Sequence, residues 1–280
     1  MKRTFSHYVA RVIWHLLGRR NLVRMARFLG NEARLDCPND MLANGERMAQ
    51  EMLCRMFQAE PLCVFDVGAN IGNWTASLCD LTRANDRNLT VHAFEPSPAT
   101  YSRLADRYDS PRANCQVLCR DLALSSNIGV MPFYLGDPEA GTNSLSPSIL
   151  RKSQTTEEVQ TGTVDDYSRS EKITRIHFLK IDTEGQDLEV LYGAQRLLSD
   201  GKVDIVQFEY NWRWIEAKHF LREAFDLLEP LGYSLGKLTP YGVEVYPGWH
   251  FELETFKEGN YLAMKDSLLD AFPQVRWWNV

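Results

Sequence analysis

The chain has 280 residues, of which 44% are hydrophobic and 24% charged, values that are typical of a globular protein able to bury a full core. Its formal net charge of −6 disfavours nucleic acid as the main partner, because nucleic-acid-binding surfaces are basic. None of the six cysteines forms a C-x-x-C pair, so we expect all six to be reduced and structural, which favours a cytoplasmic location.

Residues 1–60 are predicted to form a helical extension that precedes the main domain. Seven lysines and arginines come before the first acidic residue, Glu32. Apolar residues recur among them at helical spacing, over a run too short to span a bilayer, and no secretory signal is recognisable. Two interpretations remain open: a helix that caps the domain, or a basic amphipathic helix that lies at the inner face of the membrane.

From residue 61 onwards, strands alternate with helices. The expected strands are 62–67, 90–95, 116–120, 176–181, 203–208, 233–238 and 261–264, with a short extra strand at 131–135. The expected helices are 72–81, 98–108, 188–198 and 217–228. Residues 137–163 are polar and without a period, so we expect a loop or lid there. Buried strands alternating with helices predict an α/β fold with a doubly wound sheet, covered on both faces, over residues 61–280.

The first predicted strand runs into an acidic residue, Asp66, and then a two-glycine turn at Gly68 and Gly72. Glycine permits positive φ and a close backbone approach to a ligand, and the following helix offers free N–H groups. The dinucleotide fingerprint is not matched, because Asn70 occupies the position of its middle glycine. An acid just before the turn repels phosphates but suits a positive sulfonium and amino group, which favours S-adenosylmethionine over NAD.

Acidic residues also follow the next two predicted strands. Glu95 ends the second, where a carboxylate can accept hydrogen bonds from both ribose hydroxyls. Asp121 follows the third, where it can bind the adenine amino group while Leu122 packs on the ring. Any one acid could simply cap a helix, but three at successive strand ends indicate a nucleoside cofactor. The predicted cofactor-binding residues are Asp66, Gly68, Asn70, Gly72, Asn73, Glu95, Pro96, Asp121, Leu122 and Asp182.

These segments resemble the FkbM-type family of class I S-adenosylmethionine-dependent methyltransferases. The resemblance rests on residues 65–72, 94–96 and 122–125 and, most specifically, on the Leu-Lys-Ile-Asp-Thr-Glu-Gly segment at 179–185. It implies a seven-stranded methyltransferase sheet and O-methylation, often of sugar or polyketide hydroxyls. It also implies that residues 163–167 form the strand before the catalytic region.

A hydroxyl is a poor nucleophile while it is protonated, so a nearby base would help methyl transfer. The candidate catalytic residues are Asp182, Glu184 and Glu209, which end the fourth and fifth predicted strands or follow closely. Two roles remain open for them. Asp182 or Glu184 acts as the base, or Asp182, Glu209 and Asn211 hold a Mg²⁺ that lowers the hydroxyl pKa. Glu184 is also placed to cap the next helix.

The acceptor is expected to be a small molecule or glycan, although no motif identifies it. Tyr210, Trp212 and Trp214 either stack on a sugar or pack under a lid, and His177 is expected to lie in the core. Two other functions remain open from the sequence. One is an NAD-dependent oxidoreductase on a similar sheet, which the incomplete fingerprint disfavours. The other is a non-catalytic protein that binds a membrane or a partner through its N-terminal helix.

Overall fold

A computed structural model describes residues 2–37, 39–110, 112–135, 143–147 and 155–280. The chain forms two compact units, residues 1–38 and residues 39–280. Within the described residues, no helix is both long and apolar enough to cross a membrane.

The first unit contains α1 (Lys2–Leu17) and α2 (Arg19–Ala33), which are separated at Gly18, where φ is +75°. A third helix, α3 (Glu46–Met56), belongs to the second unit and buries Ala49 and Leu53 in its core. The helical character of the extension is therefore present, whereas the domain division at residue 60 stays a prediction.

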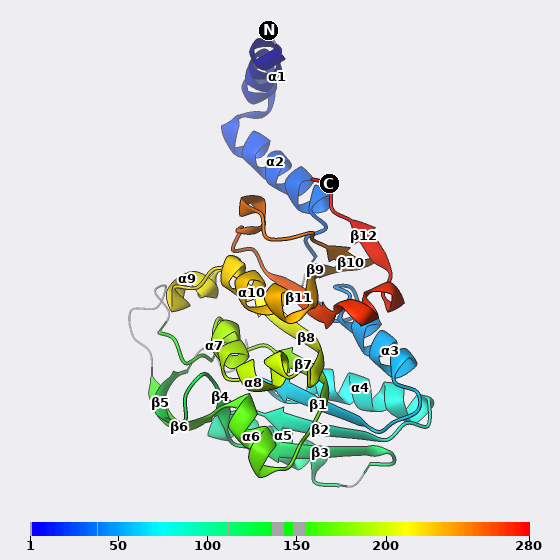
Figure 1. Ribbon diagram of the computed structural model, residues 1–280. Coiled ribbons are helices and arrows are strands. Elements are labelled where there is room, and N and C mark those ends of the chain that lie inside the picture. The colour runs from blue at the N-terminus through cyan, green and yellow to red at the C-terminus, as the bar shows by residue number, and fades with distance from the viewer. Residues whose placement is uncertain (1, 38, 111, 136–142, 148–154) are drawn as a thin grey trace. The chain divides into compact units, whose positions relative to one another are not determined.

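A nine-stranded sheet forms the centre of the second unit, in the order β12-β10-β9-β11-β8-β7-β1-β2-β3 (Figure 1). The strands are β1 (Leu62–Val67), β2 (Leu89–Phe94), β3 (Cys115–Arg120), β7 (Ile176–Ile181), β8 (Val203–Tyr210), β9 (Tyr233–Thr239), β10 (Gly242–Val245), β11 (Gly259–Lys265) and β12 (Gln274–Arg276). Strands β3, β2, β1, β7 and β8 run parallel, and β11 is antiparallel to both β8 and β9.

The predicted doubly wound fold is thus confirmed, with β10 and β12 extending the seven expected strands to nine. The chain winds outwards from β1 in one direction and from β7 in the other. The crevice between the carboxyl ends of these two strands is therefore the switch point at which such sheets bind ligands.

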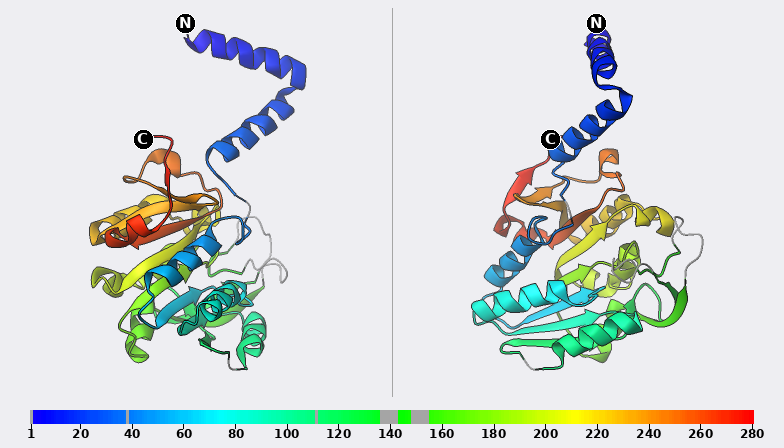
Figure 2. Two further views of the ribbon diagram at one scale, coloured as in Figure 1. Left: turned by 90° about the vertical axis from the view of Figure 1, so that its right-hand side faces the viewer. Right: turned by 180° about the vertical axis from the view of Figure 1, so that it is seen from behind.

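Helices cover both faces of the sheet (Figures 1 and 2). One face packs against α3, α4 (Asn73–Ala84) and α5 (Pro98–Tyr108), and the other against α6 (Val164–Ser170), α7 (Asp187–Tyr192), α8 (Gln195–Ser199) and α10 (Leu221–Leu228). The short α9 (Arg213–Ala217) follows β8. Neighbouring residues of β1 belong to opposite cores, since Val64 shares one core with Leu78 of α4 and Phe65 shares the other with Leu188 of α7. The 3₁₀ segments are η1 (Glu229–Leu231), η2 (Phe251–Leu253) and η3 (Asp266–Ala271).

A second, three-stranded sheet has the order β4-β6-β5. Its strands are β4 (Ala123–Leu124), β5 (Gly129–Tyr134) and β6 (Thr156–Gly162). The extra strand expected near residue 131 is β5. The prediction of a loop at 137–163 is wrong for the residues that form β6, where Val159 and Thr161 lie on a buried face. Residues 136–142 and 148–154 of that predicted loop lie outside the described residues.

Three further expectations are corrected by local structure. Residues 163–167 begin helix α6 rather than form a strand, because the Thr163 hydroxyl accepts a hydrogen bond from the Asp166 N–H at 3.0 Å and caps the helix. The expected helix at 188–198 is divided at Gly193, where a Cβ would lie 2.1 Å from the Ser125 carbonyl oxygen. The prediction of six reduced cysteines is wrong for Cys79 and Cys115, which form a disulfide.

Candidate functional site

A cavity of about 220 Å³ lies at the carboxyl ends of β1, β2 and β7, at the switch point of the sheet. Its polar lining includes Asn70, Glu95, Asp182 and Glu184. Apolar side chains complete one side. The lining residues are Asn39, Val67, Gly68, Asn70, Phe94, Glu95, Pro96, Thr100, Leu122, Ala123, Leu124, Phe133, Asn143, Leu145, Asp182, Thr183, Glu184 and Gln186.

The turn after β1 needs glycine at Gly68 for two reasons. Its φ is +77°, and a Cβ at this position would lie 1.9 Å from the Asp182 carbonyl oxygen. This close approach brings the end of β1 against the end of β7. Gly72 also has positive φ, and its carbonyl accepts a hydrogen bond of 2.8 Å from the Tyr108 hydroxyl of α5. The turn is therefore held between a strand and a helix.

Glu95 is the polar centre of the cavity's cofactor side. One carboxylate oxygen accepts the Asn70 N–H at 3.0 Å and the other accepts the Ser97 N–H at 3.0 Å. The side chain is 6% exposed, and burial raises the pKa of Glu95 to about 7 despite these two hydrogen bonds. Each oxygen retains a lone pair that can accept one hydroxyl group of a ligand.

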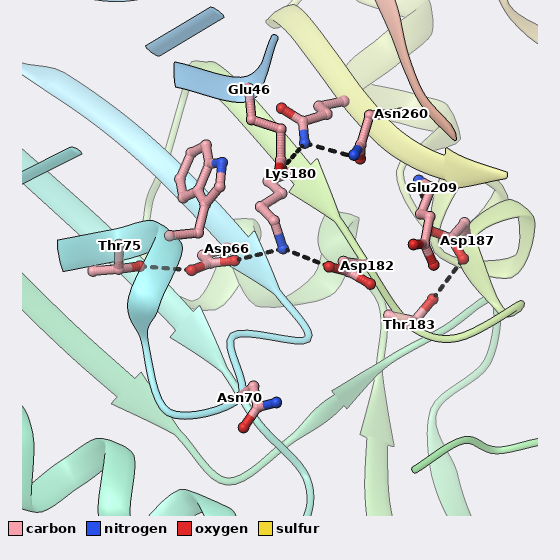
Figure 3. A network of polar contacts seen from close by, with 12 residues as sticks. Glu46, Asp66, Asn70, Thr75, Lys180, Asp182, Thr183, Asp187, Glu209 and Asn260 are labelled. Atoms are coloured by element: carbon pink, nitrogen blue, oxygen red, sulfur yellow. Dashed lines mark hydrogen bonds and ion pairs between the residues drawn. The ribbon is translucent and has the colours of Figure 1, made fainter. Parts of the chain in front are cut away.

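Behind the cavity, a buried ion network joins β1 to β7 (Figure 3). The Lys180 Nζ lies 3.4 Å from a carboxylate oxygen of Asp66 and donates a hydrogen bond of 3.2 Å to Asp182. Asp66 is fully buried, and its second oxygen accepts the Thr75 hydroxyl at 2.6 Å. Asp66 and Lys180 occupy paired positions on the two parallel strands, so their side chains emerge on the same face.

The network continues to a residue outside the sheet. Glu46, at the start of α3, is buried and accepts the Gln207 side-chain N–H at 2.6 Å and the Asn44 side-chain N–H at 3.0 Å. Burial alone would lower the pKa of Lys180, but the carboxylates of Asp182, Asp66 and Glu46 raise it above its ordinary value. Lys180 is therefore a fixed cation between the cofactor turn and the candidate catalytic strand end.

Carboxyl groups gather beyond Asp182. Glu184 forms an ion pair with the Arg213 Nε at 2.8 Å. Burial and then the charge of Asp182 raise the pKa of Glu184 to about 8 and that of the fully buried Asp187 to about 7. Burial, followed by the surrounding carboxylates, also raises the pKa of Glu209 well above its ordinary value. Three carboxyl groups with raised pKa values thus lie at one edge of the sheet.

The proposed Mg²⁺ ligands do not form a metal site. Both polar atoms of Asn211 are engaged, because its amide donates to Glu209 at 2.6 Å and its oxygen accepts the Arg213 N–H at 2.8 Å. Asp182 is paired with Lys180. Across the described part of the chain, no group of three or more His, Cys, Asp or Glu side chains is placed to hold one ion. The Mg²⁺ interpretation has no support in this arrangement.

The cavity gathers many of the predicted site residues but not all. Gly68, Asn70, Glu95, Pro96, Leu122, Asp182 and Glu184 line it, whereas Asp66, Gly72, Asn73, Asp121 and Glu209 do not. Asp66 faces the ion network, and Gly72 serves the turn. Asn73 accepts a hydrogen bond of 2.8 Å from Arg107, and Asp121 is exposed. Glu209 is buried beside Asn211.

The sequence did not predict the role of Lys180 in the ion network. It also did not predict that Phe133 of the second sheet and Leu145 of the segment 143–147 line the cavity. An ionisable residue within an otherwise apolar strand was the available signal for Lys180. Tyr210 and Trp214 are fully buried, which favours packing over sugar stacking. His177 lies in the core as expected, where its Nδ1 accepts the Cys63 N–H at 3.0 Å.

The residues present fit an S-adenosyl cofactor. Glu95 offers free acceptor positions for ribose hydroxyls, and Leu122 and Phe133 offer an apolar surface for adenine. Asp182 also lines the cavity, and its carboxylate would attract the positively charged sulfonium.

Comparison with known proteins supports the same reading. A family profile described as the methyltransferase FkbM domain matches residues 66–235, which is more than half of the chain. The chain is also 34% identical over 145 residues to the hexuronic acid methyltransferase AglP of Haloferax volcanii. That match covers 51% of this chain and 54% of AglP, so the chain spans about half the length of this curated relative.

Solved structures match at lower similarity. The METTL16 methyltransferase domain matches with a TM-score of 0.43 at 9% identity, covering 78% of this chain and 65% of that one. A precorrin-6y C5,15-methyltransferase from Geobacter metallireducens matches with a TM-score of 0.38 at 13% identity, covering 78% and 88%. Likenesses at this level add nothing about the site. Because the family profile spans the cofactor turn, Glu95 and the candidate catalytic carboxylates, the chain belongs to the FkbM family and carries its S-adenosylmethionine-dependent methyltransferase domain.

Proposed function

We propose that this protein transfers the methyl group of S-adenosylmethionine to a hydroxyl of a carbohydrate, with sugars that carry a hexuronate as the first acceptors to test. The observation that carries the proposal is that Glu95 and the pair Asp182 and Glu184 line one cavity, from the ends of neighbouring strands. A nucleoside-binding carboxylate and candidate proton acceptors thus border the same space. The similarity to AglP, by its name a hexuronic acid methyltransferase, supports the choice of acceptor.

The cofactor supplies a methyl group already activated by its sulfonium, so the protein's task is alignment and handling of one proton. Glu95 accepts the ribose hydroxyls. Asp182 lines the cavity beside its partner Lys180 and borders the space for the sulfonium. Glu184 receives the hydroxyl proton while the new carbon–oxygen bond forms and the carbon–sulfur bond breaks.

Glu184 suits this role because one of its carboxylate oxygens pairs with Arg213 while its side chain also borders the cavity. A general base works best when its pKa lies near the working pH, and burial raises the pKa of Glu184 to about 8. Asp182 is the less suitable base, because one of its carboxylate oxygens already accepts a hydrogen bond of 3.2 Å from the buried Lys180.

The test is methyl transfer from isotopically labelled S-adenosylmethionine to a panel of oligosaccharides that end in neutral sugars or hexuronates. A labelled product that survives mild alkali is a methyl ether and supports transfer to a hydroxyl. A product that alkali cleaves is a methyl ester and overturns the hydroxyl assignment. Glu95→Gln is the control for cofactor binding, and Glu184→Gln tests the proton acceptor.

No observation favours an NAD-dependent oxidoreductase or a non-catalytic role. The family match assigns the cofactor turn to a methyltransferase domain rather than to an NAD-dependent oxidoreductase. A non-catalytic role would be indicated by loss of the polar lining, yet Asn70, Glu95, Asp182 and Glu184 all border the cavity.

A further inference from the structure

The positive charge of this protein is concentrated at one end of the sequence. The first 30 residues contain seven lysines and arginines and no acidic residue. The rest of the chain contains 24 basic and 37 acidic side chains, a formal charge of −13. A charge asymmetry of this size indicates that the N-terminal unit binds a negatively charged partner of its own.

The helices of this unit present apolar faces. In α2, Leu22, Met25, Ala26 and Leu29 follow the spacing i, i+3, i+4 and i+7, which places them on one side of the helix. No residue of α2 is buried. In α1, apolar residues recur in the same way from Tyr8 through Val12 to Leu16, the first and last of which are 69% and 78% exposed.

Exposure of large apolar side chains is concentrated in the same segment. Of the 20 large hydrophobic residues that are exposed among the described residues, ten lie between Tyr8 and Leu29. A segment of this length has far less than half of the surface of the chain. Its exposed apolar side chains therefore mark an interaction surface rather than the ordinary scatter of surface residues.

The basic residues of α2 lie on the other side of the helix. Arg20, Arg24 and Arg27 are each about half a turn from the apolar face, and all three are exposed. In α1, Arg11 is exposed and lies about a quarter turn from the line of Tyr8, Val12 and Leu16. Helix α2 thus combines one apolar face with an arginine face, and α1 continues the apolar surface.

We propose that α1 and α2 bind in the plane of an anionic lipid surface. A protein partner that covers the apolar face leaves the arginines pointing into solvent, so it uses only half of the pattern. At a lipid interface both faces of α2 are used, because its apolar side chains enter the acyl boundary while its arginine side chains extend to the headgroup phosphates. Neither helix is able to cross the bilayer, so the contact is peripheral.

The test is flotation of the full-length protein with vesicles of phosphatidylcholine alone or mixed with phosphatidylglycerol. We expect flotation with the anionic vesicles only, and its loss at high salt. Each basic residue near an anionic surface contributes roughly a fivefold increase in partitioning, so changing Arg20, Arg24 and Arg27 to Gln is expected to reduce it roughly 100-fold. Met25→Ser with Leu29→Ser is expected to reduce flotation even at low salt.

A matched control carries Ile128→Ser and Val130→Ser, which remove exposed apolar side chains elsewhere, and its flotation should equal that of the unchanged protein. Thermal unfolding of the α2 variants should be unchanged, since α2 buries no side chain. Equal flotation with neutral and anionic vesicles, or none with either, would overturn the proposal. So would a dimer in light scattering that Met25→Ser with Leu29→Ser converts to a monomer, because it assigns the apolar face to a second copy.

Discussion

Cofactor binding should strengthen as the pH rises from 6 to 8, because of Glu95. Burial raises the pKa of Glu95 to about 7, so about a tenth of the protein carries the carboxylate at pH 6 and about nine-tenths at pH 8. Ribose hydroxyls donate to the charged form, in which each oxygen keeps an acceptor position beside the bond from Asn70 or Ser97. Binding that selects the carboxylate should therefore tighten about tenfold, equivalent to about 1.4 kcal/mol.

The assay is isothermal titration calorimetry with 5′-methylthioadenosine, which keeps adenine and ribose but lacks the amino acid group that titrates in this range. Glu95→Gln should bind about 10-fold to 100-fold more weakly at pH 8, since a hydrogen bond to a charged group is lost, and its Kd should not vary with pH. Glu157→Gln, which changes an exposed acid on β6, should keep the original pH dependence. An equal Kd at pH 6 and pH 8 for the unchanged protein would refute the role assigned to Glu95.

Three other predictions follow from the contacts around the cavity. Gly68→Ala should abolish cofactor binding and lower the free energy of unfolding well beyond the roughly 1–2 kcal/mol of a positive-φ alanine, because its Cβ would overlap the Asp182 carbonyl. Gly232 also has positive φ, +80°, but no atom lies within 4 Å of an added Cβ, so Gly232→Ala should show only the smaller loss of unfolding free energy in urea titrations. Equal losses for Gly68→Ala and Gly232→Ala would contradict the overlap with Asp182. Lys180→Met leaves Asp66 buried without its cation and should lower the free energy of unfolding by about 3–5 kcal/mol. Adding Asp66→Asn should restore part of this loss. A loss below about 1 kcal/mol for Lys180→Met alone would argue against the network. Burial raises the pKa of Glu184 in the free protein to about 8, so kcat/KM for the acceptor should rise about tenfold between pH 7 and pH 9 as the carboxylate forms. A Glu184→Gln enzyme that keeps this profile would exclude Glu184 as the proton acceptor.

The parts of the fold that local pattern determines were predictable from the sequence. β1 and α5 begin and end where the apolar runs and Pro98 place them, and Glu95 lies in the cavity because it ends a strand beside the switch point. Family resemblance added the segment that carries Asp182 and Glu184. These residues are specified by short stretches of chain.

Contacts between distant segments were not predictable in the same way. Asp66 was expected to face the cofactor, but it points to the face where Lys180 lies at the paired position of β7. Glu46 joins this network from a helix that precedes the sheet, and nothing in its local sequence indicates the contact with Gln207. Strand pairing, which depends on the whole fold, decides which side of each strand borders the cavity.

Thr163 shows how a capping contact outweighs a resemblance. The segment from residue 163 was expected to be extended, yet the hydroxyl of Thr163 caps α6, and Asp165 accepts the Arg196 and Leu197 N–H groups at 2.8 and 3.0 Å. These bonds connect α6 to α8. Polar side chains that satisfy helix ends are specific to each sequence, so the resemblance did not anticipate them.

The proposed function requires that the cavity between β1 and β7 supports methyl transfer to a carbohydrate hydroxyl. Its most direct test is mass spectrometry of the oligosaccharide panel after incubation with the protein and S-adenosylmethionine. We expect an acceptor that gains one CH₂ as an alkali-stable ether, with far less product from Glu95→Gln under the same conditions. Protein that binds S-adenosylmethionine but methylates no member of the panel, or a product that forms equally with Glu95→Gln, would contradict it.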